Sequence, residues 1–61
     1  MFIKAERTHY PTVVWVRVSS ITEVLDDHGP MGETLFYVGA VQYRAHNFTP
    51  ERLLEYLEAA R

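Results

Sequence analysis

The sequence predicts a small α+β fold: an antiparallel sheet of three to five short strands, arranged as a meander, with one C-terminal α-helix packed on it. Short runs of β-branched and aromatic residues, separated by Pro and Gly, are typical of strands joined by turns. The final segment, residues 50–60, instead has helical periodicity and clear helix-start signals. With 61 residues, the chain has room for a single domain, residues 1–61, with a small core.

The expected strands are the runs 2–7, 13–18, 21–25, 34–38 and 41–46. Pro11 ends the first strand, because proline cannot donate a ladder hydrogen bond and holds the residue before it extended. Side chains alternate along a strand, so Val14, Val16 and Val18 should form a row that faces the core. The intervening residues of the same strand, facing the opposite side, are Val13, Trp15 and Arg17.

Two segments are each compatible with two structures. Residues 19–27, SSITEVLDD, fit a tight turn or bulge at Ser19–Ser20 followed by a short strand, or a single helical turn. Gly39–Ala40 fits a two-residue hairpin turn, in which Gly39 takes a positive φ, or a bulge that bends one long strand.

The C-terminal helix is expected at about residues 50–60. Thr49 is a good N-cap, Pro50 suits the first helical position, and Glu51 complements the positive end of the helix dipole. Phe48 and Leu53 have the spacing of a hydrophobic staple. The residues of its apolar stripe are Leu53, Leu57 and Ala60, with Leu54 and Tyr56 at the margins.

Composition excludes several classes of protein. Without cysteine, the chain can form neither disulfides nor thiolate zinc sites, which favours a reducing interior and a cytoplasmic location. A net charge of −2 with only six basic residues does not provide the basic stripe of a nucleic-acid-binding protein. No apolar run approaches the 18 or so residues of a membrane-spanning helix. We therefore expect neither nucleic acid nor a membrane as a partner.

Catalytic and metal-binding patterns do not stand out. His9, His28 and His46 are widely spaced, without the close pairs that metal sites show, so we expect no metal. Asp26, Asp27 and Glu33 do not have the spacing of a calcium loop, and we interpret them as a solvated acidic turn. The sequence contains neither a nucleophile elbow nor a phosphate-binding loop, so we expect no cofactor and no enzymatic activity.

The aromatic residues are the most informative set. We expect Phe36 and Val38 to face the core, and the opposite face of their hairpin to hold Leu35, Tyr37, Val41 and Tyr43. One amphipathic helix cannot cover both faces of a sheet, so a second apolar surface should be left for a partner. The residues expected at this interface or ligand site are Val13, Trp15, Arg17, Tyr37, Tyr43 and Arg44.

Trp15 is the expected anchor of self-association, with Arg17 at the rim. The alternative is that the Tyr10–Pro11 turn or the loop at 26–32 covers Trp15 within one copy of the chain. In a second hypothesis, the chain is an oligomer that holds a nucleotide-like small molecule between protomers. Trp15 or Tyr43 would then stack on the base, and the phosphate would pair with Arg17, Arg44 or Arg7.

The order of elements also carries a resemblance to a known type of protein. A first strand, VVWVRVSSITEVLDD, a loop, ETLFYVGAVQYRAHN and TPERLLEYLEAA together resemble small bacterial proteins of the FlbD/SwrD type, associated with flagellar gene expression and swarming. The loop DDHGPMG is longer than in those proteins, and the asparagine-rich turn before SSI is missing. The chain also looks like small phage-encoded host-takeover or anti-defence proteins. The resemblance implies no catalytic residues. Because the predicted sheet has a second apolar face and the sequence lacks catalytic motifs, we expect a non-enzymatic regulator or inhibitor that binds proteins and forms a homodimer or larger homo-oligomer.

Overall fold

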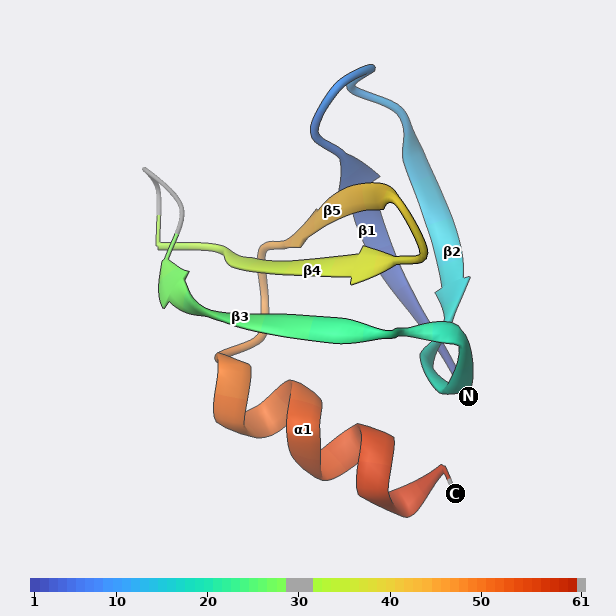
Figure 1. Cartoon of the computed structure of the whole chain (residues 1–61), viewed down its shortest axis with the longest axis vertical. Helices are drawn as coiled ribbons and strands as arrows, with labels where there is room; N and C mark the ends of the chain where they lie inside the picture. The colour runs from blue at the N-terminus through green and yellow to red at the C-terminus, as the bar shows by residue number, and fades with distance from the viewer. Residues whose placement is uncertain (29–31, 61) are drawn as a thin grey trace.

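Five antiparallel strands form one open sheet, and a C-terminal helix packs against it in the computed structural model (Figure 1). The model describes residues 1–28 and 32–60, with the backbone alone for residues 27 and 28. The elements are β1 (Phe2–Arg7), β2 (Val13–Arg17), β3 (Glu23–His28), β4 (Thr34–Val38), β5 (Val41–Ala45) and α1 (Pro50–Ala59). The predicted α+β fold class is confirmed.

The strand order is β2-β1-β5-β4-β3. The predicted meander is present in β3, β4 and β5, which lie side by side in chain order, and β1 and β2 form a separate hairpin. Pairing of β1 with β5 joins the two parts. As a result, the consecutive strands β2 and β3 lie at opposite edges of the sheet.

A single 3₁₀ turn, η1 (Val18–Ser20), connects the two edge strands. The Ile21 N–H donates to the Val18 carbonyl at 3.1 Å and closes the turn. Of the two structures that the sequence allowed here, the tight turn followed by a strand is therefore the correct one. The strand begins at Glu23 and runs on to His28, beyond the predicted end at residue 25.

Gly39–Ala40 is a two-residue hairpin turn, with Gly39 at φ +63° and Val38 directly opposite Val41. Glycine at the first central position with positive φ is the pattern of a type II′ turn. This register places Tyr43 opposite Phe36 and therefore on the same face of the sheet. In the sequence-based prediction, Val41 and Tyr43 lie on the other face of the sheet from Phe36 and Val38, and this prediction was wrong. It continued the alternation of faces through the turn, whereas the register pairs Val41 with Val38 and Tyr43 with Phe36 on one face.

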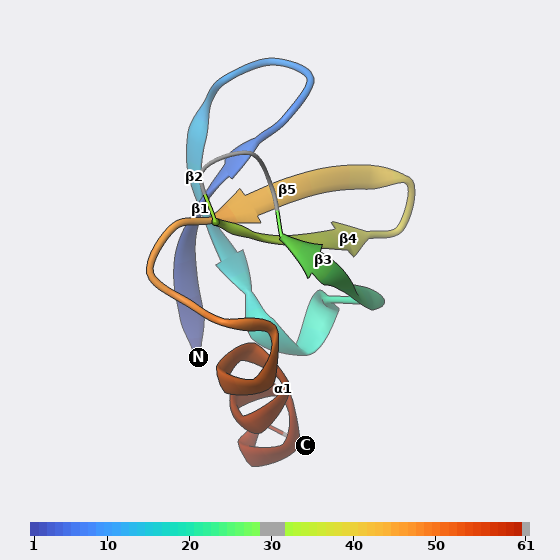
Figure 2. The ribbon, with the colours of Figure 1, turned by 90° about the vertical axis from the view of Figure 1, so that its left-hand side faces the viewer.

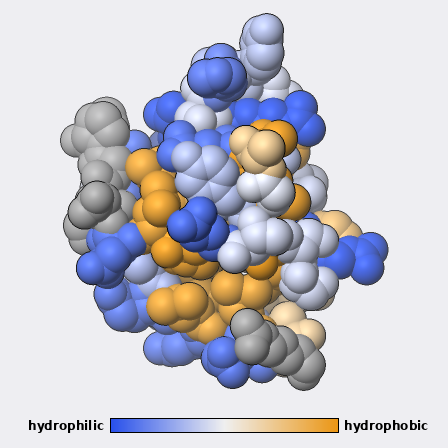
Figure 3. All heavy atoms as spheres, viewed as in Figure 1, coloured by the Kyte–Doolittle hydropathy of each residue, from blue (hydrophilic) through white to orange (hydrophobic). Residues whose placement is uncertain are grey.

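The core lies between the concave side of the bent sheet and α1 (Figure 2). Phe36 and Tyr43 stack at its centre with ring centroids 5.4 Å apart. The buried apolar residues are Ile3, Ala5, Val16, Val18, Ile21, Phe36, Tyr43, Ala45 and Leu53. In the space-filling view, apolar side chains also gather along the boundary between the sheet and α1 (Figure 3).

The N-terminus of α1 is fixed by the predicted cap. Thr49 Oγ1 accepts from the Arg52 N–H at 3.1 Å, and Pro50 occupies the first turn. Just before the cap, the Thr34 hydroxyl donates to the Phe48 carbonyl, and the Phe48 ring packs edge-to-face on Tyr56 with centroids 5.2 Å apart. These contacts tie the start of α1 to the sheet.

The loop before β4 differs from its sequence-based interpretation. Glu33 is almost completely buried, so it does not belong to a solvated acidic turn. Pro30 and the neighbouring residues 29 and 31 of this loop lie outside the described residues. Across 1–28 and 32–60, no helix has the length and apolar character needed to cross a membrane.

Candidate interaction surface

The β1–β2 hairpin places six side chains on the face of the sheet that points away from the core. In its register, Phe2 is opposite Arg17, Lys4 is opposite Trp15, and Glu6 is opposite Val13. Directly opposite residues in an antiparallel pair share a face. We call this surface the hairpin face; its residues are Phe2, Lys4, Glu6, Val13, Trp15 and Arg17.

Three of the six residues of the hairpin face are large apolar side chains that lie exposed. Trp15 is 68% exposed, Val13 57% and Phe2 52%. The Arg17 guanidinium lies over the Phe2 ring, 5.3 Å from its centroid. Trp and Arg side by side are the residue types enriched at binding hot spots.

Within residues 1–28 and 32–60, Trp15 is left largely exposed. With Trp15 68% exposed and Tyr10 77% exposed, the Tyr10–Pro11 turn does not fold over the indole. The alternative that the Tyr10–Pro11 turn covers Trp15 is therefore wrong, and the other cover considered, the loop at 26–32, lies partly outside the described residues. Val13, Trp15 and Arg17 face outward together, as the alternation of the sequence predicts.

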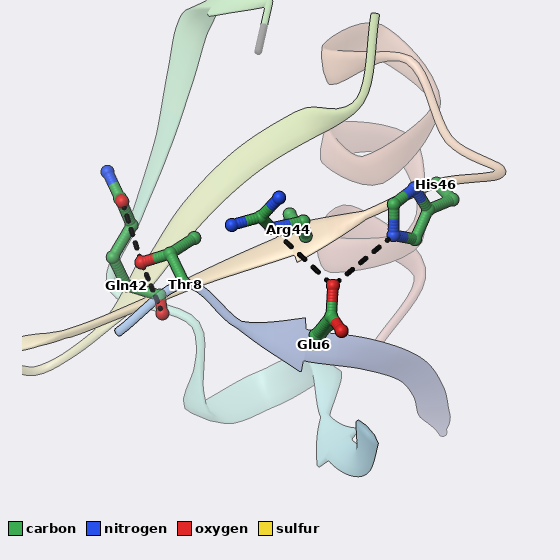
Figure 4. Close-up of polar contacts among 5 residues, drawn as sticks. All are labelled: Glu6, Thr8, Gln42, Arg44 and His46. Carbon is green, nitrogen blue, oxygen red and sulfur yellow. Dashed lines mark hydrogen bonds and ion pairs between the residues drawn. The ribbon is translucent and has the colours of Figure 1, made fainter. Parts of the chain in front are cut away.

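Arg44 borders the hairpin face but is engaged within the chain. Its Nε lies 3.7 Å from Glu6 Oε1, and His46 Nε2 approaches the same oxygen at 3.7 Å (Figure 4). The Arg44 and Glu6 side chains are each more than a quarter exposed, so this ion pair contributes at most about 1 kcal/mol to stability. The pair lies at the border between β5 and the hairpin face.

The backbone of β2 alternates between β1 and the open edge of the sheet. The Arg7 N–H donates to the Thr12 carbonyl at 3.1 Å, and the Val18 N–H donates to the Met1 carbonyl at 2.9 Å. Hydrogen-bonded pairs alternate along an antiparallel ladder, so Val14 and Val16 also direct their backbone groups toward β1. Those of Val13, Trp15 and Arg17 point away from β1, on the side where no described strand pairs with β2.

A separate groove lies between the β1–β2 turn and the β4–β5 turn, with a volume of about 590 Å³. The Thr8 hydroxyl donates to Gln42 Oε1 at 2.9 Å, and Gln42 Nε2 donates to the Tyr37 hydroxyl at 3.3 Å (Figure 4 shows the Thr8–Gln42 pair). Arg7, Tyr10 and Val41 also line the groove. Tyr37 therefore belongs to this groove and not to the hairpin face.

Tyr43 is the predicted site residue that the structure contradicts. It is only 8% exposed and stacks on Phe36 in the core, so it is neither an interface residue nor a stacking platform for a base. With Tyr43 buried, the nucleotide hypothesis retains Trp15 as its stacking residue, and Arg44 already faces the Glu6 carboxylate. Among the described residues, no three His, Asp or Glu side chains come together as a possible metal site.

The sequence did not single out Phe2 and Lys4 as site residues. Phe2 could be recognised as an apolar residue beside Ile3, on the opposite face of the strand, but its position beside Arg17 depends on the register of the hairpin. Comparison with models of protein families, with curated proteins and with solved structures found no match to the chain.

Proposed function

We propose that this chain is a non-enzymatic intracellular regulatory protein that acts by binding proteins, itself included, through the hairpin face. The observation that supports this most is the 68% exposure of Trp15, next to exposed Phe2 and Val13. Burying apolar surface lowers the free energy by about 25 cal/mol per Å², which favours contact between such a surface and a partner. A cation over an aromatic ring and a carboxylate at the border provide the polar rim.

Small size gives self-association a further advantage. A chain of 61 residues buries only about 60% of its unfolded surface, and it has no cysteine with which to form a disulfide. Contact between the hairpin faces of two copies would add apolar burial that the single chain lacks. The regulatory role itself is proposed from the exposed hairpin face together with the lack of catalytic motifs in the sequence, and the resemblance to proteins of the FlbD/SwrD type agrees with it.

The test compares Trp15→Ser with Tyr10→Ser. Both changes remove an exposed aromatic ring, but Tyr10 lies in the β1–β2 turn, outside the hairpin face. We expect wild type and Tyr10→Ser to sediment as oligomers at micromolar concentration, and folded Trp15→Ser to sediment as a monomer. A folded Trp15→Ser that associates as strongly as wild type would contradict the proposal.

A nucleotide screen separates this function from small-ligand binding. A ligand at 100 times its dissociation constant stabilises the folded state by about 2.7 kcal/mol, which a thermal-shift measurement resolves. We expect no nucleotide to shift the midpoint of wild type. A shift that disappears in both Trp15→Ser and Arg17→Ala would instead assign the hairpin face to a nucleotide.

A further inference from the structure

We propose that β2 pairs antiparallel with β2 of a second copy, in a register centred on Trp15, so that the two sheets become one continuous sheet. This pairing specifies how the self-association proposed above occurs, and it therefore depends on that function. The occupant of the open edge is thus a second copy of this chain. A two-fold axis passes beside Trp15, and both copies contribute the same residues.

The backbone of β2 supplies the first argument. The groups of Val13, Trp15 and Arg17 that point away from β1 have the spacing of hydrogen-bonded positions in a second antiparallel ladder. With Trp15 opposite Trp15 of the second copy, Val13 falls opposite Arg17 of that copy. Every outward residue then exchanges backbone hydrogen bonds with a partner. In a register shifted by one residue, the outward N–H and C=O groups of each β2 would face residues of the second β2 whose own N–H and C=O groups point back toward β1. The outward groups would then have no hydrogen-bond partner.

The side chains of β2 match in the same register. The segment VVWVR has valine on both sides of Trp15, so Val14 falls opposite Val16 of the second copy on the core side of the sheet. Val14 is only partly buried in the single chain and packs against the edge of the core, which such a contact would extend. On the hairpin face, the two indoles become cross-strand neighbours, an arrangement that stabilises antiparallel pairs.

Charge is complementary across the proposed contact. In each copy, Glu6 of β1 lies directly opposite Val13 of β2. In the proposed register, Arg17 of one copy and Glu6 of the second copy therefore lie on either side of the second copy's Val13. Strands are about 4.8 Å apart, which puts this Arg and Glu within reach of one another over a valine side chain. Like charges do not fall opposite each other in this register, because Arg17 meets Val13 and Trp15 meets itself.

The other edge of the sheet is less suited to pairing. Figures 1 and 2 both show α1 lying next to β3, and covering an edge with a helix is one way in which proteins block edge pairing. The pairing of β3 with β4 is irregular between Val24 and His28, and Glu23 and Asp26 are exposed acidic residues. By contrast, β2 contains neither proline nor lysine, and its register with β1 is regular.

Arg17→Pro tests this inference with little risk to the fold. Arg17 already has φ −70°, close to the value that proline requires, and its N–H points away from β1. Proline therefore removes a hydrogen-bond donor from the open edge alone. Arg17→Ala is the matched control, because it also lacks the guanidinium but keeps the N–H. In sedimentation equilibrium, we expect Arg17→Pro to raise the dimer dissociation constant at least about 10-fold above that of Arg17→Ala.

The outcomes distinguish this inference from the proposed function. A wild-type chain that is monomeric at all concentrations overturns both. A dimer that is equally strong in folded Arg17→Pro and Arg17→Ala overturns the β2 pairing and leaves association through the hairpin face in place.

A cysteine pair decides the question if Arg17→Pro does not fold. The chain has no cysteine of its own, and residues 13 and 17 of one strand are too far apart for a disulfide. Opposed across the two-fold axis, they would be about 5.5 Å apart at Cα. We expect Val13→Cys/Arg17→Cys to form a disulfide-linked dimer under mild oxidation, and Val13→Cys alone to form little. Equal cross-linking in the double and single variants would overturn the proposed register. Pairing of β2 with β3 of the second copy is one arrangement that would not favour the double variant.

Discussion

Trp15 stands opposite Lys4 in the hairpin, on a strand whose other face supplies Val16 to the core. An indole in this position is exposed only because no part of the described chain reaches across it. Its neighbours make that exposure costly, since Phe2 and Val13 extend the same apolar surface. At the scale of single residues, Trp15 is therefore the group whose environment should change most when a second molecule binds.

Tryptophan fluorescence, excited selectively so that the four tyrosines do not contribute, reports on this residue alone, because Trp15 is the single tryptophan of the sequence. In dilute solution, we expect emission near that of a solvated indole. As concentration rises through the association range, the emission maximum should move to shorter wavelength, because a second copy removes water from the ring. Tyr10→Ser serves as the control and should show the same shift. A blue-shifted maximum that is independent of concentration would mean that the indole is already buried in the single chain.

Single residues also show what sequence reasoning can and cannot reach. Alternation along one strand correctly assigned Trp15 and Arg17 to the outer face, because it depends on local backbone geometry alone. Tyr43 was assigned wrongly, because its face depends on how two strands pair across the Gly39–Ala40 turn. Glu33 was expected in water, and its burial depends on how the loop before β4 packs.

Among the elements, α1 was the most accurately predicted. Its cap, Thr49, and its first-turn proline are local signals, and both occupy the expected positions. The apolar stripe was correct in outline, but the extent of burial differs along it: Leu53 is fully buried, whereas Leu57 is only partly buried and Leu54 is half exposed. Periodicity identifies the stripe, but only the position of the helix on the sheet determines which residue lies deepest.

Leu53 and Leu54 form a matched pair for testing the packing of α1. Both are leucines in the same turn of helix, so replacing either with alanine changes helix propensity by the same amount. We expect Leu53→Ala to lower the free energy of unfolding by about 2–5 kcal/mol, as for other buried leucines. Leu54→Ala should lie within about 0.5 kcal/mol of wild type. Urea denaturation measures both, and equal effects would mean that α1 packs through a different face.

The strands β2 and β3 show the limit of element-level prediction. The sequence indicated both strands and a turn between them, but not that they would lie at opposite edges of the sheet. That arrangement follows from the pairing of β1 with β5, a contact between the two ends of the sheet-forming sequence. It is also what leaves the backbone of β2 unpaired on one side, and hence what creates the candidate interface.

For the molecule as a whole, a small core and an open edge strand favour association. The radius of gyration of 10.3 Å is close to the roughly 10.5 Å typical of a compact domain of this length, so the chain is as compact as an ordinary domain of its size. A second molecule would bury the apolar surface that the hairpin face leaves exposed. Under the proposed pairing, folding and association are linked, and the thermal midpoint should increase with protein concentration.

The most direct test of this account is amide hydrogen exchange in β2, measured residue by residue by NMR at two protein concentrations. In the dilute monomer, Val14 and Val16 should be protected by β1, while Val13, Trp15 and Arg17 should exchange rapidly from the open edge. At a concentration where sedimentation shows the dimer, we expect all three outward amides to become protected. Rapid exchange of the Trp15 amide in the dimer would contradict it.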